Sequence, residues 1–288
     1  MLAKLPTRLP LRAGERRTLS ALIICCNEAD RIEDCLRSLH GWVDEIIVFD
    51  SGSTDGTLDI VRRYTDKVWK TDWPGYGPQR NRALKQASGD WVLYIDADER
   101  VTPELRQEID NALIDPHLDT TLFRIPWRTY LFDGELRHGR YATPQNRLFK
   151  REGARFRDHQ VHEQILLPER RAAVMKAKLE HRSWRDYAHL QRKHRRYANL
   201  LAKQKFEEGA RGSIPYACMR FCTDFVQQYL LRLSVLDGWR GLMISTVLAQ
   251  YAYWKYADLK ALEREAAKTV VPATTKTLAP ASAALLRR

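Results

Sequence analysis

Polar and acidic side chains follow three apolar runs in the first hundred residues of the chain. The runs span 19–25, 45–49 and 91–95, and they are short and rich in Val, Ile, Leu and aromatic residues, as buried parallel strands are. The polar residues that follow them are Asn27 and Glu28, the stretch 50–57, and Asp96, Asp98 and Glu99. Because ligands bind outside the carboxyl ends of the strands in an open α/β sheet, we expect these groups to meet in one pocket. Such a pocket suits a nucleotide diphosphate and its metal.

The chain is strongly basic. Its 288 residues include 48 Lys or Arg and 36 Asp or Glu, a formal charge of +12, and 44% of the residues are hydrophobic, which is enough for a core. The charge indicates a polyanionic partner, which can be nucleic acid, an anionic membrane or a phosphorylated substrate. Charge alone does not choose among these three.

Targeting and redox features favour a cytoplasmic location. None of the five cysteines forms a Cys-x-x-Cys pair, so we expect reduced thiols and no zinc or redox site. Residues 1–17 are basic but contain Pro6 and Pro10 and no continuous apolar core, which argues against a secretory signal. The best apolar stretch, 241–254, is shorter than the roughly 20 residues that a membrane-spanning helix needs.

The pattern along the chain predicts an α/β domain followed by helices. Residues 18–115 alternate strands and helices, the pattern of a mostly parallel sheet flanked by helices, and 116–180 carry short β-like pieces that would complete the pocket and help hold the acceptor. Residues 181–265 read as helices. We treat 1–17 as a basic extension and expect 266–288, rich in Ala, Thr, Pro and Lys, to be disordered.

Local signals predict the helix positions. In the first part, helices are expected at 29–39, 57–64, 79–87 and 103–113, the last capped by Thr102 with Pro103 in its first turn. Farther on, aromatic and apolar residues recur at helical spacing from Trp184 to Leu201, and two helices are expected at 215–236 and 239–263.

Asp96-Ala97-Asp98 carries the sharpest chemical prediction. Two carboxylates at a strand end can together bind a hard divalent cation that diphosphate oxygens also ligate. An isolated Asp-x-Asp can equally be a solvated turn that caps the next helix. Its place after an apolar strand, together with the acidic block from Asp50, favours Asp96 and Asp98 as metal ligands, with Asp96 also near the nucleotide sugar.

The stretch 50–57 reads Asp-Ser-Gly-Ser-Thr-Asp-Gly-Thr and suits a nucleoside. Its hydroxyls and amides can bond ribose or phosphate, its glycines permit close approach, and Asp50 can accept from a ribose hydroxyl or a base imide. The same residues can serve as a capped turn into the next helix. The nucleotide-binding candidates in this stretch are Asp50, Ser51, Ser53 and Asp55.

Two further segments provide binding candidates. Arg80 and Asn81 lie at the predicted start of a helix, where the helix dipole and the Arg80 cation would favour phosphate, although a solvated helix start is an equal alternative. Asn27 and Glu28 end the first strand, where Glu28 either faces the nucleotide or begins helix capping.

These residues together resemble the family 2 glycosyltransferases with the GT-A fold. The motifs are Asn27-Glu28, the block 50–57, Trp73-x-Gly-Tyr-Gly-x-Gln-Arg-Asn, Gly89-Asp90-Trp91 and Asp96-Ala97-Asp98-Glu99. More narrowly, the chain resembles the lipopolysaccharide core glucosyltransferases of the WaaE/KdtX type. That resemblance continues through His138-Gly139, Arg147-Leu148-Phe149, Val161-His162-Glu163 and Asp237-Gly238, and it covers about residues 19–262.

The resemblance implies a Rossmann-like GT-A fold with a C-terminal helical region and a defined chemistry. It implies inverting transfer of a hexose, commonly glucose from UDP-glucose, with Mg or Mn as the divalent metal. The acceptor would be a sugar hydroxyl of the lipopolysaccharide inner core or of another lipid-linked glycan. In such enzymes the first acidic block contacts the nucleoside, here Asp50, and the Asp-x-Asp corresponds to Asp96 and Asp98.

An inverting displacement needs a base that takes the acceptor proton. Glu163 is the first candidate and Glu99 the second. His162 is a candidate metal ligand, base or hydrogen-bonding wall. The alternative for 161–163 is a strand that alternates between core and solvent.

Two other function classes compete with this interpretation. A phosphotransferase or phosphatase could use Asp96 as its nucleophile, although Glu99-Arg100 does not fit that motif. A nucleic-acid-binding protein would explain the basic helices, but the usual recognition signatures are missing, and no nucleic acid is expected. The basic and aromatic helices of 181–265 fit two interpretations equally: binding to an anionic membrane surface, or a helical subdomain whose aromatic side chains pack inward. The first would place the enzyme peripherally on the inner face of the inner membrane.

Overall fold

The computed structural model describes residues 15–157 and 164–270. The strands are β1 (Leu19–Cys25), β2 (Glu45–Asp50), β3 (Val68–Lys70), β4 (Trp91–Tyr94), β5 (Glu99–Val101), β6 (Leu122–Ile125), β7 (Trp127–Leu131), β8 (Gly134–Leu136), β9 (Gln145–Lys150), β10 (Arg155–Phe156), β11 (Ile165–Leu166), β12 (Ala172–Val174) and β13 (Leu179–His181). The helices are α1 (Ile32–Leu39), α2 (Thr57–Val61), α3 (Tyr76–Gln86), α4 (Pro103–Ile114), α5 (Tyr187–Glu207), α6 (Ile214–Val226) and α7 (Gly238–Val270). The short turns are η1 (Arg140–Ala142) and η3 (Ser234–Asp237), which are 3₁₀-helical, and η2 (Gln227–Leu231), which is π-helical.

The central sheet brings the three acidic strand ends to one edge. Its seven strands run in the order β12-β6-β9-β4-β1-β2-β3, with β4, β1, β2 and β3 mutually parallel and β9 antiparallel to β4. Cys25 pairs with Asp50 and Leu22 pairs with Tyr94, so β1, β2 and β4 end side by side. The predicted α/β sheet and the predicted shared edge are both confirmed.

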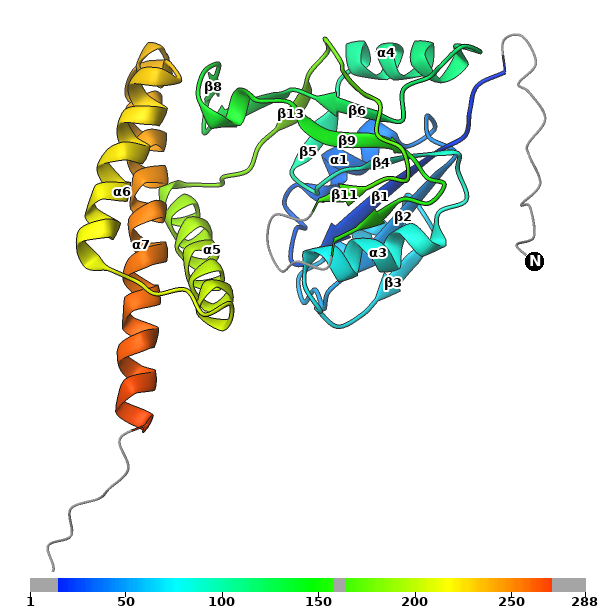
Figure 1. The fold of residues 1–288 in the computed structure, drawn as a ribbon. Helices are drawn as coiled ribbons and strands as arrows, with labels where there is room; N and C mark the ends of the chain where they lie inside the picture. The colour runs from blue at the N-terminus through cyan, green and yellow to red at the C-terminus, as the bar shows by residue number, and fades with distance from the viewer. Residues whose placement is uncertain (1–14, 158–163, 271–288) are drawn as a thin grey trace, which may run out of the picture.

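Helices cover both faces of this sheet (Figure 1). Side chains of a strand alternate between the two faces, so Ala21 and Ile23 join α1 and α4 in one buried cluster. Leu22 points the other way and joins α3 and Phe156 in a second cluster. Helix α4 begins as predicted, because the Thr102 hydroxyl accepts from Leu105 N at 3.2 Å and Pro103 occupies its first turn.

A second sheet extends the domain beside the Asp-x-Asp motif. It has the order β5-β13-β7-β8, and its β13 pairs antiparallel with β5 so that His181 lies opposite Glu99. The sequence did not predict β5. Its short extended segment places residues that are far apart in the chain next to Asp96 and Asp98.

The C-terminal helices stand beside the sheet domain (Figure 1). Helix α7 packs against both α5 and α6. Leu131 and Leu136 of the second sheet share a buried cluster with Trp184, Leu190 and residues of α7. The described residues contain no helix with the length and hydropathy needed to cross a bilayer.

Some helix boundaries differ from the prediction. Helix α3 starts at Tyr76, three residues before Gln79, because Gly75 at φ 114° turns the chain and Pro78 is tolerated in a first helical turn. The predicted helix 215–236 stops being α-helical after Val226 and continues as η2 and η3. Helix α7 includes 266–270, which composition had assigned to the tail, because Ala and Lys are strong helix formers.

Candidate active site

Two loops at the strand ends are joined by hydrogen bonds. Asn27, which has a left-handed backbone (φ 57°), accepts from Thr54 N through its side-chain oxygen at 2.8 Å, and its own N–H donates to Ser53 Oγ at 2.8 Å. The Asp55 carboxylate accepts from Ala29 N at 3.2 Å and from Thr57 N at 3.1 Å. The structure therefore brings Asn27, Ser53 and Asp55 together as one rim, and the N-cap position of α2 is Gly56, with Asp55 bonding the first N–H of the helix from one residue earlier.

Asp50 is fully buried beneath this rim. Its Oδ1 accepts from Gly52 N and Ser53 N, both at 2.9 Å, and its Oδ2 accepts from the Ser53 hydroxyl. These bonds show that the carboxylate shapes the 50–57 turn. The parts of the turn available to a nucleoside are its exposed edge and the half-buried Ser51. The Ser51 hydroxyl accepts from Gln79 Nε2 at 3.1 Å.

Asp96 lies between two arginines. Its Oδ1 accepts from Arg80 at 2.8 Å and its Oδ2 accepts from Arg147 at 2.8 Å. Burial acts to raise the pKa of Asp96, but the Arg147 and Arg80 cations lower it well below the ordinary value. Asp96 is therefore a carboxylate that orients two guanidinium groups at the end of β4.

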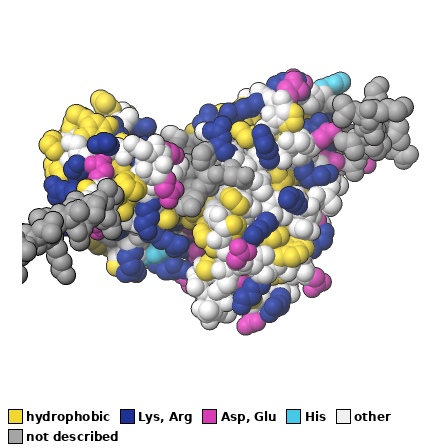
Figure 2. Space-filling model, turned by 60° about the horizontal axis from the view of Figure 1, so that its bottom comes forward, with side chains coloured by type: hydrophobic (Ala, Val, Ile, Leu, Met, Phe, Trp, Pro, Cys, Tyr) yellow, Lys and Arg dark blue, Asp and Glu magenta, His cyan; other side chains and the backbone are white. Residues whose placement is uncertain are grey.

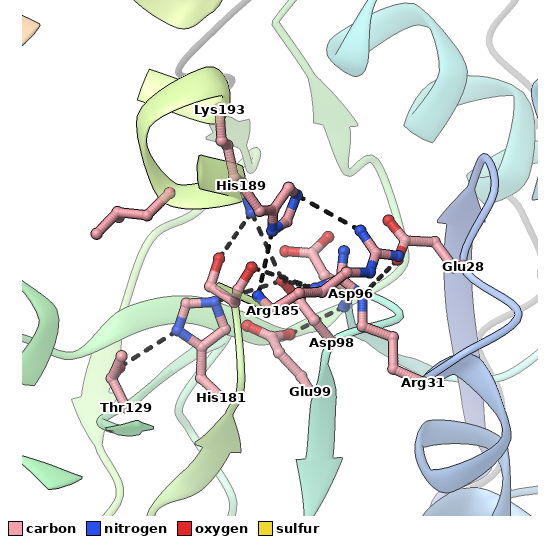
Figure 3. Close-up of polar contacts among 12 residues, drawn as sticks. Glu28, Arg31, Asp96, Asp98, Glu99, Thr129, His181, Arg185, His189 and Lys193 are labelled. Atoms are coloured by element: carbon pink, nitrogen blue, oxygen red, sulfur yellow. Dashed lines mark hydrogen bonds and ion pairs between the residues drawn. The ribbon is translucent and has the colours of Figure 1, made fainter. Parts of the chain in front are cut away.

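Asp98 differs from Asp96 in its surroundings. Its side chain is 9% exposed, and no described residue donates a hydrogen bond to its carboxylate. Three nitrogens lie just beyond hydrogen-bonding distance of Oδ2, namely Lys193 Nζ at 3.6 Å, His181 Nε2 at 3.8 Å and Arg31 Nη1 at 3.9 Å (Figure 3). Burial acts to raise the pKa of Asp98, and Lys193 and His181 lower it below its ordinary value. A charged, buried carboxylate without a hydrogen-bond donor has free lone pairs for a cation.

The hydrogen bonds of His181 define which of its nitrogens carries the proton. The Thr129 hydroxyl lies 3.2 Å from His181 Nδ1 and donates its single proton to the carbonyl of Tyr141 at 3.0 Å. In the tautomer that this arrangement favours, Thr129 accepts from Nδ1–H and the lone pair of Nε2 faces Asp98. Burial lowers the pKa of His181 to about 4, against the opposing effect of Asp98, so the ring is neutral near pH 7.

Asp98 and His181 thus fit a divalent metal. A carboxylate and an unprotonated imidazole are both metal ligands, and the Thr129 bond fixes the ring as second-layer partners of metal-binding histidines do. Within the described ranges, no three His, Cys, Asp or Glu side chains already form a metal-binding group. The remaining ligands would come from the diphosphate and water, as magnesium sites commonly use.

Helix α5 supplies cations to this cluster. The helix is capped by Asp186, which accepts from His189 N at 2.6 Å, and its next turns carry Lys193 toward Asp98. Lys193 Nζ also donates to Ser183 Oγ at 2.7 Å. Tyr197, one turn farther, shares a 2.7 Å hydrogen bond with Tyr76 and so ties α5 to α3 of the sheet domain.

Glu28 is held by arginines from two elements. Arg31 forms an ion pair with its carboxylate, and Arg185 Nη2 lies 3.3 Å from the same oxygen (Figure 3). Burial raises the pKa of Glu28, and Arg31 opposes that shift. Glu28 therefore links the end of β1 to the segment leading into α5, and its role toward the nucleotide stays a prediction.

Arg80 and Asn81 have different surroundings. Arg80 reaches Asp96 and is buried, whereas both amide atoms of Asn81 bond the backbone of Phe156, with Nδ2 to the carbonyl and Oδ1 to the N–H at 2.8 Å each. Asn81 thus anchors β10 against α3. The prediction that Arg80 lies at the first turn was wrong, because α3 begins one turn earlier.

Glu99 lies inside the protein and cannot reach an acceptor in this structure. Its side chain is completely buried, Oε1 accepts from Trp127 Nε1 at 2.7 Å and from Arg147, and Oε2 accepts from Asp96 N at 2.9 Å. Burial raises its pKa, and Arg147 opposes the rise. The geometry corrects the interpretation of Glu99 as a base and makes it a support of Arg147 and of the motif backbone. The other candidates, Glu163 and His162, lie outside the described residues.

Sequence reasoning missed His181, Lys193 and Arg31 as members of this cluster. Lys193 and Arg147 were noted only as part of a basic helix and of a family motif. Nothing in the spacing of His181 marks it, because its place beside Asp98 results from the pairing of β13 with β5.

Comparisons with known proteins identify the family of the chain. The profile of the family described as Glycosyl transferase family 2 matches residues 20–166. The lipopolysaccharide core biosynthesis glycosyltransferase LpsC of Rhizobium meliloti (strain 1021) is 32% identical over 259 residues, which cover 84% of this chain and 91% of LpsC. An uncharacterized glycosyltransferase of Rickettsia bellii (strain RML369-C) is 27% identical over 258 residues, 85% of this chain and 87% of that protein. The structure of S. aureus TarS 1-349 in complex with UDP-GlcNAc is 17% identical and covers 88% of this chain and 92% of its own, with a TM-score of 0.45.

The chain belongs to family 2 of the glycosyltransferases. This membership confirms the resemblance and the GT-A fold that the motifs predicted. It favours sugar transfer over the phosphotransferase and nucleic-acid-binding alternatives.

Proposed function

We propose that the protein is an inverting, metal-dependent hexosyltransferase that moves a hexose, glucose from UDP-glucose in the first instance, to a sugar hydroxyl of the lipopolysaccharide inner core. The observation that carries this proposal is the Asp98 carboxylate, buried without a hydrogen-bond donor from the described residues and faced by Nε2 of His181 at 3.8 Å. The similarity to LpsC over most of both chains supports the acceptor class. Transfer to another lipid-linked or surface glycan is the alternative.

The leaving diphosphate needs positive charge around it. A Mg or Mn ion held by Asp98 and His181, with Asp96 nearby, would supply Lewis-acid stabilisation of that charge. Lys193 is already at the site and partly exposed, so it can bind phosphate oxygens as negative charge develops on them, while Arg80 and Arg147, buried and held by Asp96, add positive potential behind it. The acceptor oxygen forms a bond to the anomeric carbon while the bond to the diphosphate breaks and its electron pair leaves with the phosphate.

The acceptor proton goes to a base on the opposite face of the sugar. Because Glu99 is enclosed, Glu163 stays the first candidate, and His162 stays a candidate for a supporting role. Both assignments are proposals for residues that the structure does not describe.

A groove lined by α5 and Trp254 of α7 offers a place for an anionic acceptor. It measures about 610 Å³ and is lined by Gln191, Arg192, Arg195, Arg196, Asn199 and Trp254. Burial raises the pKa of the Cys26 thiol and Arg196 opposes that rise, so the Arg196 charge acts at the end of β1. Guanidinium groups suit phosphate, and an indole ring beside amides suits a sugar ring.

The acceptor class implies a location. We place the enzyme on the cytoplasmic side of the inner membrane, bound peripherally to an anionic surface where a lipid-linked acceptor is present. The net charge of +12 supports an anionic partner of this kind.

Calorimetry with a panel of nucleotide sugars, with and without Mn²⁺, tests the donor and the metal together. We expect UDP-glucose to bind more tightly with Mn²⁺ and Asp98→Asn to lower transfer by about 10²-fold or more. Asp34→Asn is the matched control, since Asp34 is an exposed carboxylate that pairs with Arg100 at 2.5 Å. Full transfer by Asp98→Asn, or transfer that continues in excess chelator, contradicts the proposal.

A further inference from the structure

The tip of the α6–α7 hairpin exposes an unusual amount of apolar surface. Between Val226 and Leu242, eight large hydrophobic side chains are 39–75% exposed, the most exposed being Leu231 at 75% and Leu236 at 65%. These residues, which we call the apolar cap, are Val226, Leu230, Leu231, Leu233, Val235, Leu236, Trp239 and Leu242. Figure 2 shows hydrophobic side chains gathered over the helical region with Lys and Arg beside them. Contiguous apolar surface of this kind marks a site that meets a partner.

The apolar cap is a well-packed part of the protein. Leu233 has a left-handed backbone (φ 60°), and its N–H donates to the carbonyl of Leu230 at 3.1 Å, which closes the turn between η2 and η3. Beneath it, Ser234 is buried, and a Cβ on Gly241 would lie 1.7 Å from the Ser234 carbonyl oxygen. The backbone is thus tightly fitted while the apolar side chains point outward.

Polar contacts fix the apolar cap to the catalytic sheet. Gly139 N donates to the Arg232 carbonyl at 3.0 Å, Arg140 N donates to Gln228 Oε1 at 3.1 Å, and His138 Nδ1 lies 2.9 Å from Asp237 Oδ1. These partners all lie in the segment that follows β8. Any external surface that binds the apolar cap would therefore also orient the second sheet, whose β13 carries His181.

The charge around the apolar cap favours an anionic surface. Arg232 is exposed and has no carboxylate partner among the residues that the structure describes, and Arg137 is 74% exposed. The neighbouring carboxylates are engaged, Asp237 by His138 and Asp224 by Arg220 at 2.7 Å. A second copy of a chain with net charge +12 would bring like charges together, whereas an anionic bilayer would not.

We infer that the apolar cap inserts its leucines and Trp239 into the interface of an anionic phospholipid bilayer, with Arg232 at the headgroups. A Trp beside Leu side chains and Arg is the composition of such interfacial segments. The inference rests on the proposed membrane location and deepens it, because it assigns the contact to the helical tip and not to the basic face of α5. The tip and the fixed β8 contacts together set the catalytic domain in one orientation above the lipid.

Vesicle sedimentation with the full chain tests this inference. The probes are vesicles of phosphatidylethanolamine with phosphatidylglycerol, and vesicles of phosphatidylcholine alone. The variant Leu231→Ser/Leu236→Ser keeps the net charge and removes only apolar insertion, and Arg232→Ala tests the charge separately. Val174→Ser is the matched control, because Val174 is 54% exposed and lies on β12 at the edge of the central sheet.

We expect the natural chain and Val174→Ser to bind the anionic vesicles, the double serine variant to lose about tenfold in bound fraction, and Arg232→Ala to lose less. Unchanged binding by the double variant, or no binding by the natural chain, overturns the inference. Ultracentrifugation without vesicles tests whether a second copy of the chain binds the apolar cap. A dimer that the double variant converts to a monomer would assign the apolar cap to a second copy and would also overturn the inference. Hydrolysis of UDP-glucose, measured without vesicles, reports on the proposed function independently of membrane binding.

Discussion

Replacing Arg147 should be among the most destabilising single changes near the active site. Arg147 is 4% exposed, donates to Asp96 Oδ2 at 2.8 Å, forms an ion pair with the fully buried Glu99, and lies over the Tyr94 ring at 4.5 Å. Arg147→Met keeps much of the volume but leaves the Glu99 carboxylate buried with only the Trp127 and Asp96 N–H donors. Removing one partner of a buried ion pair costs about 3–5 kcal/mol, so we expect a loss of this size in the free energy of unfolding.

Urea denaturation at pH 9, followed by tryptophan fluorescence, measures this loss, because burial raises the pKa of Glu99 to about 8 and the carboxylate is charged above that value. The matched control is Arg171→Met, which also removes an arginine with two acidic partners, Glu169 and Asp119, but on the surface, where an ion pair contributes about 0–1 kcal/mol. In a Glu99→Gln background, the negative charge of Glu99 is already absent. Arg147→Met should then lower the free energy of unfolding by about 1–3 kcal/mol less than it does in the natural chain. Equal costs in the two backgrounds would refute the buried ion pair as the cause.

Three further predictions concern the metal site and its cations. His181→Ala should weaken Mn²⁺ binding about 10- to 100-fold, measured as free Mn²⁺ by electron paramagnetic resonance, and unchanged binding would remove His181 from the ligand set. Lys193→Met should raise the Kd for UDP about tenfold. The control is Lys203→Met, which replaces an exposed lysine of the same helix and should leave the Kd unchanged. Calorimetry measures both, and equal effects would contradict a local role for Lys193. Burial lowers the pKa values of His181 and His194 to about 4 in the folded protein, from an ordinary value of about 6.5. The neutral rings therefore contribute fully to stability above pH 6.5, and this contribution falls as the pH drops toward 4. Unfolding free energies across this range should therefore decrease on acidification, and a curve that stays flat between pH 6.5 and 4 would contradict neutral buried histidines.

The sequence predicted the α/β sheet of the first 115 residues well because local patterns determine it. Apolar runs followed by polar residues identify parallel strands and the edge at which they end, and Thr102 with Pro103 marks the start of α4. Family motifs extended this to the class of enzyme. The error at α3 came from Gly75 and Pro78, whose turn signals also fit the beginning of a helix one turn earlier.

The functions of individual polar residues were harder to predict. Asp50, Asn81 and Glu99 read as binding or catalytic groups, and the structure gives each of them backbone or buried partners that a motif does not reveal. Conversely, the sequence placed the leucines around Leu231 within one predicted helix, 215–236. Only the break into η2 and η3 turns them outward.

The amino-acid order by itself determined the α/β sheet, the shared edge of its strands and the Asp96-Ala97-Asp98 motif, because strand periodicity and turn residues act over a few neighbouring positions. Tertiary structure decided which groups surround Asp98. His181 arrives through the pairing of β13 with β5, and Lys193 through the packing of α5, over separations of 83 and 95 residues in the chain (181 − 98 and 193 − 98). Contacts over such separations depend on how whole elements pack, and no local pattern encodes them.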